Sequence, residues 1–129
     1  LRHLEEYNAA RIAAADTYDK LFSTQESIVV PYRAAYTRHV FHQYTLQLEG
    51  IDRDKMVDFL AAKGIPSMIY YPVPAHRQKM FDAFGGSGYE LPVTDWLTNR
   101  VISLPMHSEL TFETQRFIAE TVIEFAKQS

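Results

Sequence analysis

The sequence contains no cysteine, which excludes disulfide bonds, thiolate metal ligands and thiol nucleophiles. No apolar run approaches the roughly 20 residues that a transmembrane helix needs, and charged residues interrupt the first ten positions, where a signal peptide would be apolar. Basic residues do not dominate either, because 13 Lys and Arg stand against 16 Asp and Glu, for a net charge of −3. We therefore expect a cytoplasmic protein with no membrane partner and no nucleic-acid partner.

The 129 residues suit one domain, and a content of 47% hydrophobic and 22% charged residues is typical of a globular chain. The first residue is Leu1 rather than Met, and no capping residue precedes the first helical pattern. This start favours a piece of a larger protein, with a processed amino terminus as the alternative. We expect residues 1–129 to form one carboxy-terminal small domain, in which residues 1–22 are a leading helix from a missing large domain and residues 40–127 are an α+β body.

Hydrophobic spacing and turn residues predict an alternation of helices and short strands. The predicted elements are, in order, helix 2–22, strand 40–49, a helix that begins after Asp52, strand 67–71, short helices over 76–84 and 92–99, strand 101–104, and a helix that Thr111 caps and that ends near Lys127. This order favours an α+β fold with a small, mainly antiparallel three-stranded sheet and helices packed on one face.

Residues 40–49 are the clearest strand, because polar and apolar side chains alternate along them. The core-facing side is predicted to hold Val40, His42, Tyr44, Leu46 and Leu48, and the more polar side Phe41, Gln43, Thr45, Gln47 and Glu49. In the first helix, Arg11 interrupts the apolar stripe. Either its charged head reaches water at the edge of the stripe, or its partner lies outside this chain.

No complete catalytic apparatus is predicted from the residues. A Schiff-base lysine must be desolvated, and none is expected among Lys20, Lys55, Lys63, Lys79 and Lys127, which fall on polar faces or near helix ends. Ser103, His107 and Asp95 lack the sharp elbow that exposes a serine nucleophile. His39 and His42 are three positions apart on a predicted strand and should point to opposite faces, so no metal site is expected.

The segment from Ile69 to Gln78 is the strongest candidate for ligand binding. It places Tyr70, Tyr71, His76 and Gln78 after a strand end, and its prolines fix the path of the backbone. Aromatic rings with hydrogen-bonding tips suit a polar ligand with flat parts, such as a sugar nucleotide. The alternative is a proline-stiffened turn whose tyrosines pack on the core, and the residues alone favour neither.

Five segments carry a further signal through their order and separation. They are Arg11–Ala13 with Tyr18 and Leu21, His39–Thr45, Gly64–Pro66 running into Tyr70–Pro74 with His76 and Gln78, Leu91–Asp95, and Ser103–Thr111. Together they resemble the carboxy-terminal end of the DegT/DnrJ/StrS family of pyridoxal-phosphate-dependent sugar aminotransferases, over nearly the whole chain.

The resemblance implies the small domain of a fold-type-I aminotransferase, which closes over an active site at a homodimer interface. It implies that the Schiff-base lysine and the other cofactor ligands lie upstream, so this chain holds no catalytic residue and no cofactor-binding residue. Substrate contacts are implied at Tyr70, Tyr71, His76 and Gln78. Three positions depart from the family's usual residues, with Tyr70 in place of histidine, Ala75 in place of leucine and Gln47 in place of arginine.

The main hypothesis therefore concerns the parent protein. It would transfer an amino group, with glutamate as the expected amino-acid donor, to a nucleotide-linked keto-sugar. This chain would contribute substrate contacts, would be inactive alone and would not hold pyridoxal phosphate. One alternative is a stand-alone module that binds a small metabolite without catalysis. Another is a structural role in which exposed apolar surface causes self-association.

Overall fold

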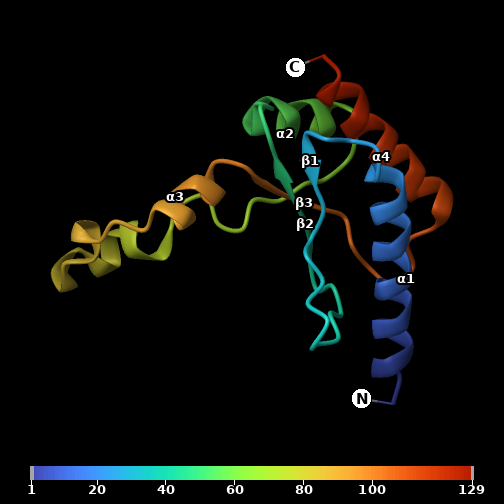
Figure 1. Ribbon diagram of the computed structural model, residues 1–129, viewed down its shortest axis with the longest axis horizontal. Helices are drawn as coiled ribbons and strands as arrows, with labels where there is room; N and C mark the ends of the chain where they lie inside the picture. Colours follow the sequence, from blue (N-terminus) through green and yellow to red (C-terminus); the bar gives the residue numbers. More distant parts are fainter. Residues whose placement is uncertain (1, 129) are drawn as a thin grey trace.

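In the computed structural model, which describes residues 2–128, helices cover one face of a three-stranded sheet (Figure 1). The elements are α1 (Leu4–Phe22), β1 (Ile28–Val29), β2 (Tyr44–Leu48), α2 (Arg53–Ala62), the 3₁₀ turns η1 (Ala75–Arg77), η2 (Lys79–Phe84) and η3 (Gly86–Gly88), α3 (Pro92–Thr98), β3 (Val101–Leu104) and α4 (Phe112–Ala126). The sheet order is β1-β2-β3 and both pairings are antiparallel. The predicted α+β fold is confirmed.

The central strand β2 sets the two faces of the sheet. Tyr44, Leu46 and Leu48 are fully buried, whereas Thr45 and Gln47 between them are half-buried. The buried face packs on side chains from α1, α2 and α4, including Tyr18, Met56 and Ile118. Alternation along the strand therefore sends every second side chain of β2 away from these helices, toward the other face of the sheet.

The predicted strand 40–49 was too long at its start. Phe41 has a positive φ of 48°, and its N–H donates to His39 Nδ1 at 3.0 Å, so the chain turns there before β2 begins at Tyr44. This turn reverses the predicted faces, because Phe41 is fully buried while His42 is exposed and Val40 is only half-buried. Alternation holds only while the backbone stays extended, and a left-handed residue interrupts it.

One other strand prediction and one helix prediction also differ from the structure. The predicted strand 67–71 is a single bridge between Met68 and Ser103, and the third strand is instead β1, whose two residues pair with Leu48 and Gln47. Two residues are too few to give a periodic signal in the sequence. The predicted short helix over 76–84 is a series of 3₁₀ turns rather than an α-helix.

The helix boundaries follow their capping residues, as predicted. Asp52 accepts a hydrogen bond from the Lys55 N–H at 3.1 Å and begins α2, and Thr111 accepts one from the Thr114 N–H at 3.2 Å and begins α4. Gly64 follows α2 with a φ of 75°, the left-handed conformation that commonly terminates a helix. These local signals fixed α2 and α4 within one or two residues.

Helix α1 is joined to the rest of the protein by buried contacts along its length. Gln115 of α4 donates to the Ala14 carbonyl at 2.7 Å, and the Tyr18 hydroxyl donates to the Pro105 carbonyl at 3.2 Å. Arg11 donates to the Val40 carbonyl at 3.2 Å and to Asn8. The partners of Arg11 therefore lie within this chain.

Residues 74–98 form an arm that extends away from the sheet and from the α1–α4 pair (Figure 1). The arm contains η1, η2, η3 and α3. It exposes large apolar side chains, among them Met80, Phe84, Tyr89 and Val93. Of the helices in residues 2–128, none combines the length and the apolar character needed to cross a bilayer.

Candidate functional site

A hollow of about 410 Å³ lies where the arm meets the sheet. We call it the α3 hollow. Its first wall is the Tyr70–Gln78 segment, its second wall is α3, and its floor comes from Thr45 of β2 and Val101 of β3. The lining residues are Thr45, Tyr70, Tyr71, Val73, Pro74, Ala75, Gln78, Thr94, Leu97, Thr98 and Val101.

Local sequence explains why the two walls stand opposite each other. Met68 and Ser103 exchange two backbone hydrogen bonds, 3.0 and 2.7 Å long, and so anchor the start of the first wall beside β3. Pro72 and Pro74 then prevent further strand pairing. The second wall begins with Pro92 at the first turn of α3, a position where proline is well tolerated. The peptide bond between Tyr70 and Tyr71 is cis.

Asp95 ties the two walls together. Arg77 Nη2 from the first wall lies 2.6 Å from Asp95 Oδ2 on α3, and His76 Nε2 lies 3.7 Å from the other carboxylate oxygen. Asp95 thus bridges the segments on both sides of the hollow. Because the ion pair is largely exposed, its contribution to stability is small, and it acts mainly to set the spacing of the walls.

Three of the four sequence-predicted site residues come together in the α3 hollow. Tyr70, Tyr71 and Gln78 all line it, and Tyr71 is 70% exposed, so its hydroxyl is accessible to a ligand. His76 does not line it. Its side chain is only 9% exposed and faces Asp95, and its ring borders a separate apolar hollow of about 250 Å³ within the arm.

Sequence reasoning missed the contribution of the other elements. Thr94, Leu97 and Thr98 line the hollow from α3, and their spacing of three and four residues puts them on one helix face. Thr45 was placed correctly on the polar side of β2, but its nearness to Tyr70 depends on the bridge between Met68 and Ser103, which holds the Tyr70 segment beside β3. The helical spacing was readable from the sequence, whereas the direction in which α3 faces was not.

Two further hollows continue from the α3 hollow along the face of the sheet that α1, α2 and α4 leave uncovered. The central hollow, of about 230 Å³, contains Tyr70, Ser103 and His42. The histidine hollow, of about 270 Å³, contains Thr45, His42 and His39. Tyr70 and Thr45 each border the α3 hollow as well, so the three hollows adjoin one another, and we call them together the trough.

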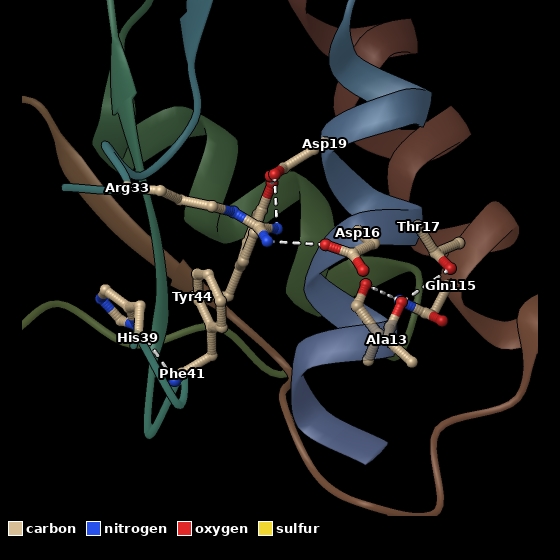
Figure 2. A network of polar contacts seen from close by, with 10 residues as sticks. Ala13, Asp16, Thr17, Asp19, Arg33, His39, Phe41, Tyr44 and Gln115 are labelled. Carbon is tan, nitrogen blue, oxygen red and sulfur yellow. Dashed lines mark hydrogen bonds and ion pairs between the residues drawn. The ribbon is translucent and has the colours of Figure 1, made fainter. Parts of the chain in front are cut away.

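A polar network on the opposite side of β2 holds the sheet against α1 (Figure 2). Arg33 donates to Asp16 and to Asp19 at 2.6 Å each, and the Tyr44 hydroxyl donates to Asp19 at 2.6 Å. Burial of the Tyr44 side chain is the larger cause, and its hydrogen bond to Asp19 the smaller one, of a pKa of Tyr44 far above its ordinary value. Because Tyr44 immediately precedes Thr45, this network fixes the residue that forms the floor of the trough.

The comparison with known protein families shows which family the chain belongs to. The sequence pattern of the DegT/DnrJ/EryC1/StrS aminotransferase family matches residues 1–123. The chain belongs to this family. The match covers α1 through nearly all of α4, so it includes every residue of the trough.

Individual family members support the assignment. A UDP-N-acetyl-3-dehydro-alpha-D-glucosamine 3-aminotransferase of Acidithiobacillus ferrooxidans is 41% identical over 93% of this chain and 31% of its own length. A pleiotropic regulatory protein of Geobacillus stearothermophilus is 35% identical over 95% of this chain and 33% of its own length. The structure of S. venezuelae DesV in complex with a ketimine intermediate superimposes on all of this chain and 34% of DesV, with a TM-score of 0.91 and 29% identity. The chain therefore spans about a third of the length of these relatives.

Members of this aminotransferase family depend on pyridoxal phosphate, and the lining of the trough does not fit that cofactor. All five lysines are exposed, and none of them borders the trough. The trough also lacks a carboxylate that could pair with the pyridinium nitrogen. Residues 2–128 likewise contain no group of three or more His, Asp or Glu placed to hold a metal ion.

Proposed function

We propose that this chain is the carboxy-terminal small domain of a sugar aminotransferase that moves an amino group from glutamate to a nucleotide-linked keto-sugar. The observation that carries the proposal is the α3 hollow, which unites Tyr70, Tyr71 and Gln78 in a chain that belongs to an aminotransferase family. The name of the Acidithiobacillus relative, an aminotransferase of a UDP-linked keto-sugar, supports the substrate class.

The chemistry of the lining fits the uncharged part of such a substrate. The α3 hollow combines hydroxyl groups of Thr45, Thr94 and Thr98 with the amide of Gln78 and two tyrosine hydroxyls. Leu97, Val73 and Val101 give it apolar patches. A sugar ring or a nucleobase has the same mixture of apolar faces and hydrogen-bonding edges, and binding it here would exclude water from that side of the ligand.

The cofactor chemistry is proposed to come from the rest of the parent protein, within a homodimer. Pyridoxal phosphate, when bound there, supplies the electron sink for amino transfer. The residues of this chain bind and orient the sugar substrate against it. The exposure of all five lysines supports a chain that is inactive on its own, because a solvated lysine stays protonated and is a poor nucleophile near neutral pH.

A cofactor titration tests this division of labour. The 129-residue chain is mixed with pyridoxal phosphate, reduced with borohydride and digested, and modified lysines are mapped by mass spectrometry. We expect slow, partial labelling spread over the five exposed lysines, with no site that saturates at one equivalent. Stoichiometric labelling of a single lysine would show that the chain holds the cofactor itself and would contradict its inactivity.

Ligand binding tests the α3 hollow directly. We expect Tyr71→Phe and Gln78→Ala each to weaken binding of UDP-N-acetylglucosamine by about threefold to tenfold, the loss of one neutral hydrogen bond. Binding is measured by NMR titration of the 129-residue chain. Tyr36→Phe is the matched control, because Tyr36 is 92% exposed and borders none of the three hollows. Unchanged affinity in both hollow variants would refute this use of the hollow.

A further inference from the structure

His39 and His42 stand together at the histidine hollow, which shares Thr45 with the α3 hollow. Both residues border it, beside Gln43. His42 also borders the central hollow, which it shares with Tyr70. The turn at Phe41 makes this possible, because it takes both histidines out of β2, on which alternation would have sent them to opposite faces.

The two rings are held differently. His39 Nδ1 accepts the Phe41 N–H at 3.0 Å, and its ring stacks on Phe41 with centroids 4.1 Å apart, as Figure 2 shows beside the buried network. These two contacts fix the orientation of the His39 ring and leave its Nε2 available to a ligand. His42 is exposed, and nothing in residues 2–128 forms a hydrogen bond or ion pair with its ring. Both rings can therefore donate a hydrogen bond to a ligand.

The charge distribution of the trough is uneven. The residues that border the three hollows include no lysine, arginine, aspartate or glutamate. His42 is the bordering side chain that can take up a second ring proton without losing a hydrogen bond, because His39 Nδ1 is occupied as the acceptor of the Phe41 N–H. Arg33 lies on the other side of β2, where Asp16 and Asp19 hold it. An anionic group is attracted to the histidine end, and a neutral group fits the α3 end.

We propose that His39 and His42 form a phosphate subsite of the trough, which takes the phosphate groups of a nucleotide-linked ligand while the α3 hollow takes its uncharged sugar. This inference rests on the proposed function for the identity of the sugar. The subsite itself is defined by the two imidazoles and requires only a phosphate-bearing molecule. The neutral His39 ring can donate through its Nε2–H while its Nδ1 keeps the Phe41 N–H, and a protonated His42 can donate a charge-assisted hydrogen bond, which is about twice as strong as a neutral one.

The test follows the histidine ring signals of the 129-residue chain by NMR at about pH 6, where an ordinary imidazole is partly protonated. Uridine, UMP and inorganic phosphate are titrated separately up to roughly millimolar concentrations. We expect UMP and phosphate to shift the His39 and His42 signals saturably, and uridine to leave them unmoved. Comparing the affinities of inorganic phosphate and UMP distinguishes a subsite for any free phosphate from a subsite for a nucleotide. UMP binds more tightly than phosphate if its nucleoside also contacts the trough.

Two conservative variants test each imidazole. In His39→Asn the new side-chain oxygen can still accept the Phe41 N–H, but the Nε2–H donor is lost. In His42→Gln a hydrogen-bonding group of similar length remains, but it cannot carry a charge. We expect His39→Asn to weaken UMP binding by about threefold to tenfold, the loss of one neutral hydrogen bond, and His42→Gln by about tenfold. His107→Asn is the matched control, because His107 is exposed, its Nδ1 accepts the N–H of Glu109 two residues on, and it borders none of the three hollows.

Each outcome separates this inference from the proposed function. If UDP-N-acetylglucosamine binding depends on Tyr71 and Gln78 but not on either histidine, the phosphate subsite is refuted and the sugar hollow stands. If phosphate shifts both histidines while Tyr71 and Gln78 variants bind normally, the subsite is supported and the sugar hollow fails. Equal shifts of His107, or no shift of His39 and His42 with any phosphate compound, overturn the subsite.

Discussion

Replacing Tyr18 by alanine is expected to lower the free energy of unfolding by about 3–5 kcal/mol, the usual cost of truncating a large buried aromatic side chain. Tyr18 is fully buried and packs between Phe22 and Tyr44, with ring centroids 6.1 and 4.9 Å away. It thus joins α1 to the central strand of the sheet. The loss is measured by urea denaturation followed by circular dichroism, as a fall in the midpoint.

Tyr18→Phe is the matched control for this prediction. It keeps the ring and removes only the hydroxyl, which donates to the Pro105 carbonyl at 3.2 Å. We expect it to cost about 1 kcal/mol, the net value of one neutral hydrogen bond. A cost in the alanine variant no larger than in the phenylalanine variant would mean that α1 does not contribute its packing to the core of the isolated chain.

The parts of the fold that were predictable from the sequence are those with local causes. Helices α2 and α4 begin at capping residues, Asp52 and Thr111, whose side chains bond the first turn. The inward face of β2 was predicted correctly at Tyr44, Leu46 and Leu48. The error at residues 40–42 has a non-local cause, because the buried position of Phe41 against Tyr44 and Arg33 is established only in the folded protein.

The candidate site was also predictable only where its causes are local in the sequence. Tyr70, Tyr71 and Gln78 lie within nine residues of one another, and prolines between them limit the possible paths of the chain, so the sequence alone could suggest a joint site. His76 lies among them in sequence but is drawn to Asp95, 19 residues away and on α3. The pairing of His39 with His42 was excluded by an assumed strand, and the structure restores it through one left-handed residue.

The two faces of β2 connect the stability of this protein to its site. Tyr44 points to the helices and is held by the carboxylate of Asp19, whereas Thr45 points to the trough and bonds Ser103 at 2.8 Å. Tyr44 and Thr45 are joined by one peptide unit, so a change at Asp19, which holds Tyr44, also acts on Thr45 in the trough. Loss of this anchor should loosen the strand that carries the floor of the α3 hollow.

Replacing Asp19 by alanine is accordingly expected to cost about 2–3 kcal/mol of unfolding free energy. The substitution leaves the buried Tyr44 hydroxyl without its acceptor and removes one of the two carboxylates that hold Arg33. Asp16→Ala is the matched control. Its side chain is 49% exposed and pairs with Arg33, which keeps Asp19 as a partner, so we expect a cost of about 0–1 kcal/mol.

The pH dependence of unfolding reports on the same contact. The raised pKa of Tyr44 means that the folded protein keeps this proton at pH values where the unfolded chain, with an ordinary pKa of 10.0, releases it. The unfolded state therefore binds fewer protons above about pH 10, and the stabilisation present below that pH is lost as the pH rises, by about 1.4 kcal/mol per pH unit. Tyr44→Phe should remove this part of the alkaline slope.

A double-mutant cycle isolates the bond between Asp19 and Tyr44. In Asp19→Ala the hydroxyl is buried without a partner, and the added change Tyr44→Phe removes that hydroxyl. We therefore expect the double variant to be about 1 kcal/mol more stable than Asp19→Ala alone, even though Tyr44→Phe destabilises the unmodified protein. Urea denaturation of the four proteins measures the coupling. Additive losses would show that the Asp19–Tyr44 bond does not contribute to stability and that Asp19 acts through Arg33.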